Sequence, residues 1–120
     1  MKYMIMMFGD QAGMMAVRSR EWVREMIQFM KNLNEDLTRS GELVHAFGLA
    51  DASQAKTVRW LDGTPVATDG PFAESKESLA GYWIVDVEAE SRAIEIAAGV
   101  VAYIEHDVEV RQVADRPPEV

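Results

Sequence analysis

Two segments of the chain are apolar at nearly every position, and this feature restricts the fold more than any other. They are residues 3–8, with the sequence YMIMMF, and residues 81–87, with the sequence GYWIVDV. Because successive side chains of a β-strand point to opposite faces, a strand made from either segment is apolar on both faces. Such strands are typical of the centre of a sheet. The fold therefore needs cover for two faces of one sheet.

A long amphipathic helix is predicted between these two segments. Ser19 can cap its first turn and Gly41 can supply the left-handed residue that ends it, so we place the helix at about residues 19–40. At 100° per residue, the apolar side chains form one stripe and the charged side chains lie opposite. The stripe consists of Trp22, Met26, Phe29, Met30, Leu33 and Leu37.

The rest of the chain combines short strand patterns, turn signals and one further helical pattern. Asp62 and Gly63 mark a tight hairpin turn, because both residues tolerate the positive φ of such turns. We expect a second helix over residues 89–98, frayed or ended by Gly99. The further predicted strands are residues 42–49, 56–61, 65–68 and 108–113.

The order strand, helix, strands, helix, strand predicts an α+β fold. It matches the ferredoxin-like split βαβ plan, with an antiparallel sheet, two helices on one face and an added β-hairpin. The pattern fits a single domain over residues 1–115, followed by a C-terminal tail at residues 116–120.

Two helices can cover only one face of this sheet. The other face would leave roughly several hundred Å² of apolar surface in water, more than soluble monomers usually expose. We therefore predict a two-fold homodimer in which the second sheet face packs on another copy of the chain. The alternative is that the hairpin and the tail fold over that face within one chain.

The charge and the residue content exclude several classes of function. With 12 basic and 20 acidic residues the net charge is −8, which repels nucleic-acid backbones and anionic membrane surfaces. The chain has no cysteine, and His45 and His106 have no metal-ligand spacing, so we expect no metal and no other cofactor. The apolar run at residues 3–8 is too short for a signal peptide or a membrane span, which favours the cytoplasm.

Residues 69–77, with the sequence DGPFAESKE, concentrate three carboxylates and one ammonium group in a turn-forming segment. Asp69 can accept hydrogen bonds from backbone amides of the turn, or it can face a pocket as a proton acceptor. Glu74, Lys76 and Glu77 can form the charged wall of a substrate-binding pocket, or they can lie on a solvated surface turn. Both interpretations stay open.

His45 and Arg59 are the other candidate site residues. By period-2 alternation His45 lies on the same side of its strand as Leu43 and Phe47, and we expect it to be partly buried. If Asp69 reaches it, the two form an acid–base couple; otherwise His45 is a hydrogen-bonded histidine of the sheet. Arg59 can hold an anionic group of a ligand or pair with a surface carboxylate.

The run at residues 69–77 resembles the signature of the DGPF-motif branch of the YCII-related superfamily, normally DGPFAETKE, with Ser75 in place of the threonine. The resemblance extends to the strand that begins Lys2–Tyr3, the strand that begins Gly81–Tyr82, and residues 108–111. It implies a ferredoxin-like fold, dimerisation through sheets as in the dimeric α+β barrels, and a cleft beside the signature. The YCII branch has a histidine and an aspartate proposed as an acid–base pair. Asp69 could match that aspartate, whereas residues 19–40 contain no histidine.

Two functions are compatible with these residues. The first is a cofactor-free small-molecule enzyme of the proton-transfer, lyase or isomerase type that uses Asp69 with or without His45. The alternative is a non-catalytic ligand-binding or regulatory module, which the resemblance associates with a sigma-factor system. In a third interpretation, residues 69–77 are a structural clamp at the dimer interface.

Overall fold

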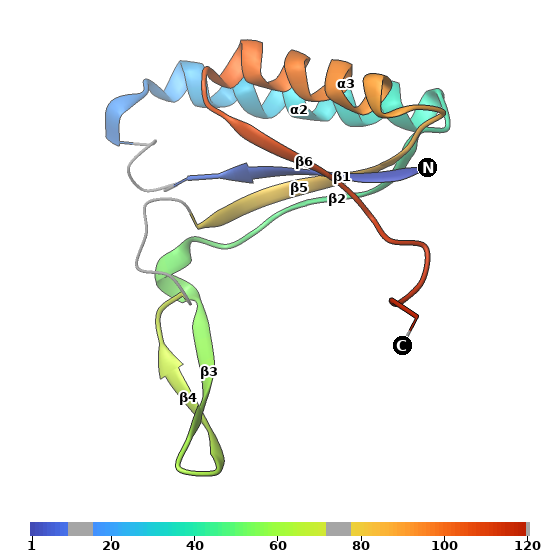
Figure 1. Cartoon of the computed structure of the whole chain (residues 1–120). Coiled ribbons are helices and arrows are strands. Elements are labelled where there is room, and N and C mark those ends of the chain that lie inside the picture. The colour runs from blue at the N-terminus through green and yellow to red at the C-terminus, as the bar shows by residue number, and fades with distance from the viewer. Residues whose placement is uncertain (10–15, 72–77, 120) are drawn as a thin grey trace.

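The computed structural model of this 120-residue chain describes residues 1–9, 16–71 and 78–119. The body of the protein is a sheet with two helices packed on it, and a hairpin projects from the body (Figure 1). The helices are α2 (Arg20–Arg39) and α3 (Glu90–Ile104), with a short 3-10 helix at Ala52–Gln54. The strands are β1 (Lys2–Phe8), β2 (Leu43–Gly48), β3 (Lys56–Leu61), β4 (Thr64–Asp69), β5 (Leu79–Asp86) and β6 (Val108–Gln112).

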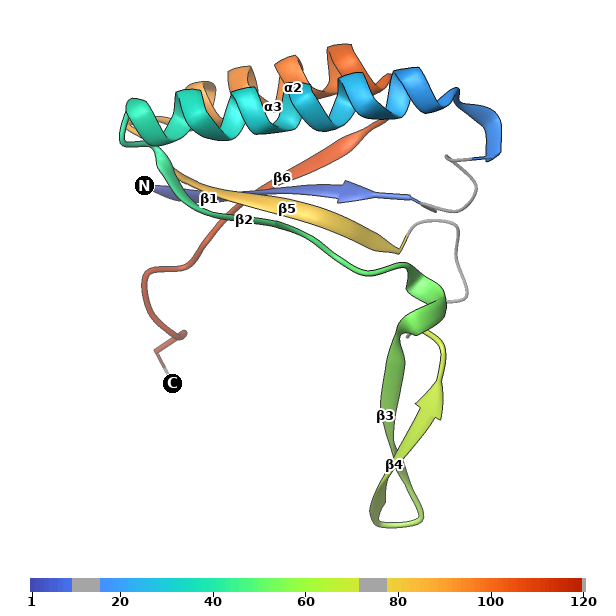
Figure 2. The same cartoon turned by 180° about the vertical axis from the view of Figure 1, so that it is seen from behind.

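The body contains a four-stranded antiparallel sheet in the order β2-β5-β1-β6. Strands β5 and β1, which contain the two-faced apolar segments, occupy its centre, as the sequence predicts. Helices α2 and α3 lie side by side on one face, which Figures 1 and 2 show from opposite sides. The prediction of a ferredoxin-like α+β fold with both helices on one face is therefore confirmed.

The core lies between the helices and the near face of the sheet. The Ser19 hydroxyl accepts a hydrogen bond from the Trp22 amide at 3.0 Å, and Gly41 has a φ of 81°, so both predicted ends of α2 are confirmed. The Trp83 indole donates to the Asn34 side-chain oxygen at 2.8 Å, which joins β5 to α2. The buried side chains are Tyr3, Ile5, Leu37, Trp83, Val85, Val87, Ala93, Ile96, Ala97 and Val100.

The predicted end of the second helix at Gly99 is wrong, because α3 continues to Ile104 and ends where Glu105 adopts a φ of 55°. A glycine inside a helix costs about 1 kcal/mol relative to alanine. Val100 directly follows it and is fully buried, and burying a valine contributes about 1.5–3 kcal/mol. Packing against the sheet thus outweighs the local preference of the glycine.

The far face of the sheet, which we call the open face, carries no helix (Figures 1 and 2). Strand register places alternate side chains of the central strands there. Most of these side chains are partly exposed, and Phe47 on the edge strand is 61% exposed. The apolar and aromatic residues of the open face are Met4, Met6, Phe8, His45, Phe47, Tyr82 and Ile84.

Strands β3 and β4 form a separate two-stranded sheet, residues 56–69, which we call the arm. Its turn is the one the sequence predicts, because Asp62 and Gly63 have φ values of 49° and 76°. The arm projects away from the open face instead of lying along it (Figures 1 and 2). The radius of gyration is accordingly 16.6 Å, against about 14 Å for a compact chain of this length. The hairpin therefore does not cover the open face.

Candidate functional site

An aromatic group containing His45 lies on the open face. The Tyr82 hydroxyl and the His45 Nδ1 atom form a hydrogen bond of 2.9 Å. The two rings are stacked with centroids 5.7 Å apart, and the Phe47 ring meets the His45 ring edge-on at 4.6 Å. We call His45, Phe47 and Tyr82 the aromatic group. It is the place on the described sheet where an imidazole, able to carry a proton, is held in a fixed orientation.

Strand register explains how these three side chains meet. Phe47 pairs with Tyr82 across β2 and β5, and a bulge between Leu43 and His45 adds one residue to the edge strand. Leu43 therefore packs against the core while His45 lies on the open face, so the prediction that they share a side is wrong. The bulge interrupts period-2 alternation and turns His45 to the face that no helix covers. The side chain of His45 is therefore exposed, whereas the sequence predicts that it is partly buried.

A glycine on β5 lets the edge strand approach closely beside the aromatic group. A Cβ atom added to Gly81 would lie 3.1 Å from the Phe47 carbonyl oxygen, tighter than about nine in ten real Cβ contacts. A larger residue at this buried position would therefore push the two strands slightly apart, beside the pair formed by Tyr82 and His45.

The direction of the hydrogen bond between Tyr82 and His45 decides whether the imidazole can accept a proton at Nε2. If the Tyr82 hydroxyl donates to Nδ1, the neutral ring carries its proton on Nε2 and donates a hydrogen bond there, but it has no free nitrogen to accept a proton. If Nδ1 carries the proton and donates to the tyrosine oxygen, Nε2 can accept a proton, and the imidazolium that results can donate it back. In either state Tyr82 orients the ring, as a second group does for the histidine of many acid–base sites.

Ion pairs at the start of β2 tie this strand to the helical layer. The Arg92 guanidinium donates to both carboxylate oxygens of Glu42, at 2.8 and 3.0 Å, and the Ser40 hydroxyl donates at 2.7 Å. The hydrogen bonds from Arg92, and then from Ser40, lower the pKa of Glu42 from 4.5 to about 2. The same interaction raises the pKa of Arg92. Glu42 therefore stays ionised and anchors the strand that carries His45.

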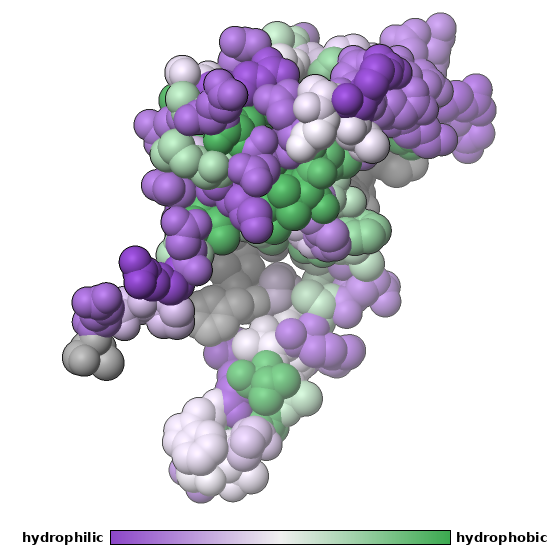
Figure 3. All heavy atoms as spheres, turned by 90° about the vertical axis from the view of Figure 1, so that its right-hand side faces the viewer, coloured by the Kyte–Doolittle hydropathy of each residue, from purple (hydrophilic) through white to green (hydrophobic). Residues whose placement is uncertain are grey.

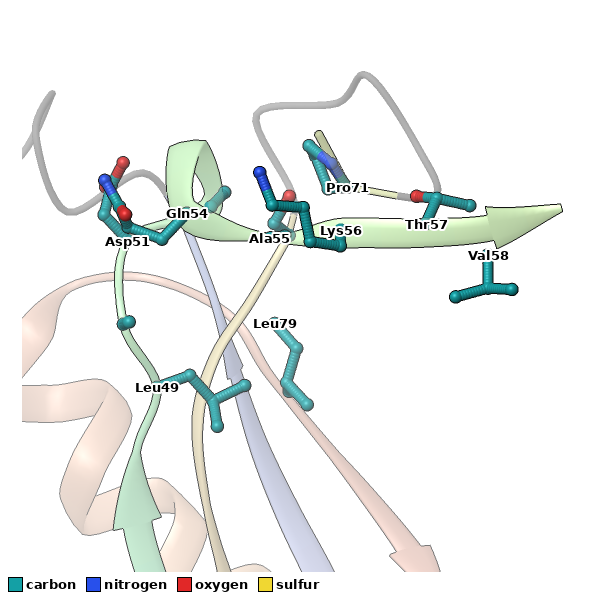
Figure 4. A pocket seen from close by; sticks show the side chains of 12 residues that line it. Leu49, Asp51, Gln54, Ala55, Lys56, Thr57, Val58, Pro71 and Leu79 are labelled. Atoms are coloured by element: carbon teal, nitrogen blue, oxygen red, sulfur yellow. The ribbon is translucent and has the colours of Figure 1, made fainter. Parts of the chain in front are cut away.

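A cleft of about 520 Å³ opens where the sheet meets the base of the arm. Leu49 and Leu79 lie next to each other at the strand ends, and Val58 points from β3 toward their side (Figure 4). Pro71 and Ser78, which flank residues 72–77, also line it. A volume of this size lies within the range of small-molecule sites.

The open face leads to this cleft. The Leu49 amide donates to the Ala80 carbonyl at 2.8 Å, so the ladder continues one residue past the end of β2. His45, Phe47 and Leu49 therefore follow one another on the same face, and about 13 Å of strand separates the first from the last.

The remaining predicted site residues lie on the arm or beyond the described part of the chain. Asp69 accepts a hydrogen bond of 2.5 Å from Lys56, and its side chain is 91% exposed. The Arg59 Nε atom donates to the Thr68 hydroxyl at 3.3 Å. The structure thus gives Asp69 and His45 different partners. Glu74, Lys76 and Glu77 lie outside the described residues.

Across residues 1–9, 16–71 and 78–119, the structure brings together no group of three or more histidine, aspartate or glutamate side chains that could hold a metal ion. Within the same ranges, neither helix is both long and apolar enough to cross a membrane.

Sequence reasoning missed Tyr82 as the partner of His45. Tyrosine and histidine are 37 residues apart, and only the pairing of β2 with β5 brings them together. The available signal is that Tyr82 alternates with the core residue Trp83, which places the tyrosine on the face without helices.

Comparison with known proteins identifies one domain family. The sequence profile of the YCII-related domain family matches residues 1–116. An uncharacterized protein of Rhizobium meliloti (strain 1021) is 26% identical over 97 residues, which are 81% of this chain and 77% of that protein. The family match covers all the described strands and helices, from β1 to β6.

Proposed function

The chain belongs to the YCII-related domain family, and from this premise we propose that it is a homodimeric, cofactor-free enzyme that transfers a proton on a small, mostly apolar molecule. His45 is the acid–base group, and Tyr82 positions it. The observation that carries this proposal is the 2.9 Å hydrogen bond between the two side chains, which lie beside the apolar side chains of Met6 and Ile84 on the open face.

Homodimer formation would shield the aromatic group from water, which a single chain does not do. His45 and Phe47 are exposed, and an exposed imidazole exchanges protons with water as readily as with a ligand. A second copy packed on the open face removes that water and turns the face into the wall of an enclosed site. This arrangement corresponds to a dimeric α+β barrel.

The surroundings of the aromatic group favour an uncharged substrate. Met4, Met6 and Ile84 lie beside it on the open face. Arg111, on the edge strand β6, is already paired with Glu109 at 2.7 Å. An apolar wall with one hydrogen-bonding imidazole selects a molecule that is apolar except for a carbonyl or hydroxyl group.

Asp69 has a structural role at the base of the arm, because its carboxylate accepts a hydrogen bond from Lys56. We also assign the chain to the DGPF-motif branch of the family. The run DGPFAESKE at residues 69–77 supports this finer assignment.

Deuterium exchange tests the proposed proton transfer without knowledge of the natural substrate. The protein is incubated in D₂O with a panel of small ketones, cyclohexanone among them, and loss of the α-proton signals is followed by ¹H NMR. We expect the wild-type protein to accelerate exchange for at least one ketone. His45→Gln should abolish the acceleration, and Tyr82→Phe should reduce it about tenfold or more, because the imidazole loses its fixed orientation.

His106→Gln is the matched control. His106 is exposed and its Nδ1 lies 3.1 Å from the neighbouring Asp107 carbonyl, away from the aromatic group. This variant should exchange as fast as the wild type. An equal loss in His45→Gln and His106→Gln, or no loss in either, would contradict the assignment of His45.

The cleft at the base of the arm supports a second function, a non-catalytic ligand-binding module. It has the volume of a ligand site, and no histidine is among its described lining residues. In this case a ketone that binds should shift the methyl signals of Leu49 and Leu79 without accelerated exchange. Shifts at the His45 ring together with exchange support the enzyme instead.

A further inference from the structure

The arm has one apolar face that is exposed in the single chain. Strand register places Val58 opposite Ala67 and Trp60 opposite Pro65 on this face, beyond the ion pair of Lys56 and Asp69 at the base of the arm. Val58 is 69% exposed and Trp60 is 72% exposed. Figure 3 shows hydrophobic atoms, drawn in green, gathered on the arm. The opposite face carries Thr57 and Arg59, together with Leu61, Thr64, Val66 and Thr68.

A hairpin of this kind needs a neighbour. An isolated two-stranded hairpin is marginally stable in water, and Thr57 is the only arm residue that is buried. The accessible surface of the chain is 8705 Å², about 2,200 Å² above the ~6,500 Å² expected for a compact chain of this size. A standard interface removes about 800 Å² from each partner. The excess surface is therefore sufficient for a stable dimer.

The direction of the arm determines which neighbour it meets. The arm projects from the end of the sheet on the side of the open face, away from the helices (Figures 1 and 2). At its base, Val58 points toward the side of Leu49 and Leu79 (Figure 4), and Trp60 follows on the same face. The apolar face of the arm therefore borders the space in front of the open face.

The length of the arm fits a second copy in that space. Packed sheets lie about 10 Å apart, whereas a strand of six residues spans about 20 Å. The arm therefore extends past the sheet of a copy docked on the open face and along the flank of that copy.

We propose that each arm clasps the second copy of the chain, with the apolar face formed by Val58, Trp60, Pro65 and Ala67 packed on the flank of that copy. This inference rests on the homodimer of the proposed function. It adds that the cleft is completed by the second copy, because Val58 lines the cleft and belongs to the face that the copy covers.

Two substitutions on neighbouring residues test the clasp. Trp60→Lys changes the apolar face, and Leu61→Lys places the same charge on the opposite face of the same strand. Both side chains are exposed, 72% and 47%, so neither variant should alter the fold of the subunit. The dimer dissociation constant is measured by sedimentation equilibrium. Trp60→Lys should raise it at least tenfold, and Leu61→Lys by less than twofold.

The outcomes separate this inference from the proposed dimer. A wild-type protein that is a monomer at 100 μM overturns both. A wild-type dimer whose dissociation constant changes equally in the two variants overturns the clasp and leaves the sheet-face dimer intact. Hydroxyl-radical footprinting of the wild type gives a measurement without substitution. Trp60 should be protected at concentrations where the dimer forms and oxidised on dilution, whereas equal oxidation at both concentrations contradicts the clasp.

Discussion

The two faces of the sheet are built from the same strands and from similar residues along β1, but helices cover only one of them (Figures 1 and 2). Tyr3 and Ile5 on β1 face the helices and are at most 2% exposed. Met4 and Met6 alternate with them, face the other way and remain partly exposed. The difference lies in the layer above each face, not in the side chains. Residue type alone therefore does not decide which apolar residues of this chain form its core.

This comparison assigns different tasks to the two faces. The helix-covered face is packed within one chain, so its side chains determine the stability of the subunit. The open face carries the imidazole and has exposed apolar surface, so under the proposed function its side chains determine association and chemistry. Substitutions on alternate residues of one strand can separate these tasks.

Ile5→Ala should give the largest effect. Ile5 is fully buried on the helix-covered face, and removing such a side chain leaves a cavity that costs about 2–5 kcal/mol. The free energy of unfolding, measured by urea titration at several protein concentrations, should fall by this amount at every concentration. The control is Met6→Ala on the next residue, for which the loss within the subunit should stay below about 1 kcal/mol. Similar losses for both variants would show that the two faces are equally packed.

Met6→Lys should break the proposed dimer while the subunit stays folded. The substitution places a charge at the centre of the open face, and burying it against a second copy costs several kcal/mol. We expect the dissociation constant to rise about 100-fold, equivalent to about 2.7 kcal/mol, with an unchanged circular dichroism spectrum. Sedimentation equilibrium measures it. If Met6→Lys dimerises as the wild type does, the interface is elsewhere.

The sequence predicts the helix-covered half of the molecule well. Residues 3–8 and the stripe from Trp22 to Leu37 have regular periods, so the central strand and the helix that covers it follow from spacing alone. The hairpin turn also follows, because few residues other than Asp62 and Gly63 tolerate its φ values. Regular local patterns are therefore enough for the fold.

The candidate site is less predictable, because it depends on departures from regular patterns. The bulge after Leu43 moves His45 to the open face, and no local residue preference marks its position. Tyr82 reaches His45 only through the register of two strands that are distant in sequence. In the structure the Asp69 carboxylate accepts a hydrogen bond from Lys56. The pairing of His45 with Asp69 stays a prediction.

The ion pair between Glu42 and Arg92 should contribute stability that depends on pH. The pKa of Glu42 is about 2, below the ordinary 4.5, so the folded state favours the ionised form of Glu42. This stability is fully present above about pH 4.5 and is lost as the pH falls toward 2. A shift of this size corresponds to at most ~3 kcal/mol, and solvent around Arg92, whose side chain is 39% exposed, reduces the expected value to about 1 kcal/mol.

Glu42→Gln should therefore lower the free energy of unfolding by about 1 kcal/mol at pH 7 and flatten its decrease between pH 4.5 and 2. Glu95→Gln is the matched control, because Glu95 pairs with the same Arg92 but its side chain is 72% exposed. This control should keep the wild-type pH dependence. Urea unfolding at a series of pH values measures both variants, and identical pH profiles for the two would refute the role given to Glu42.

Asp69→Asn should have the smallest effect on stability. The side chains of Asp69 and of its partner Lys56 are 91% and 63% exposed. Exposed ion pairs contribute about 0.2–1 kcal/mol, so the melting temperature should fall by only a few degrees. Under the proposed function the variant should also retain exchange activity, since His45 is bonded to Tyr82 and not to Asp69. Loss of exchange with an unchanged melting temperature would instead make Asp69 an acid–base group and place the site at the base of the arm. A loss of several kcal/mol would favour the third interpretation, in which residues 69–77 are a structural clamp at the dimer interface.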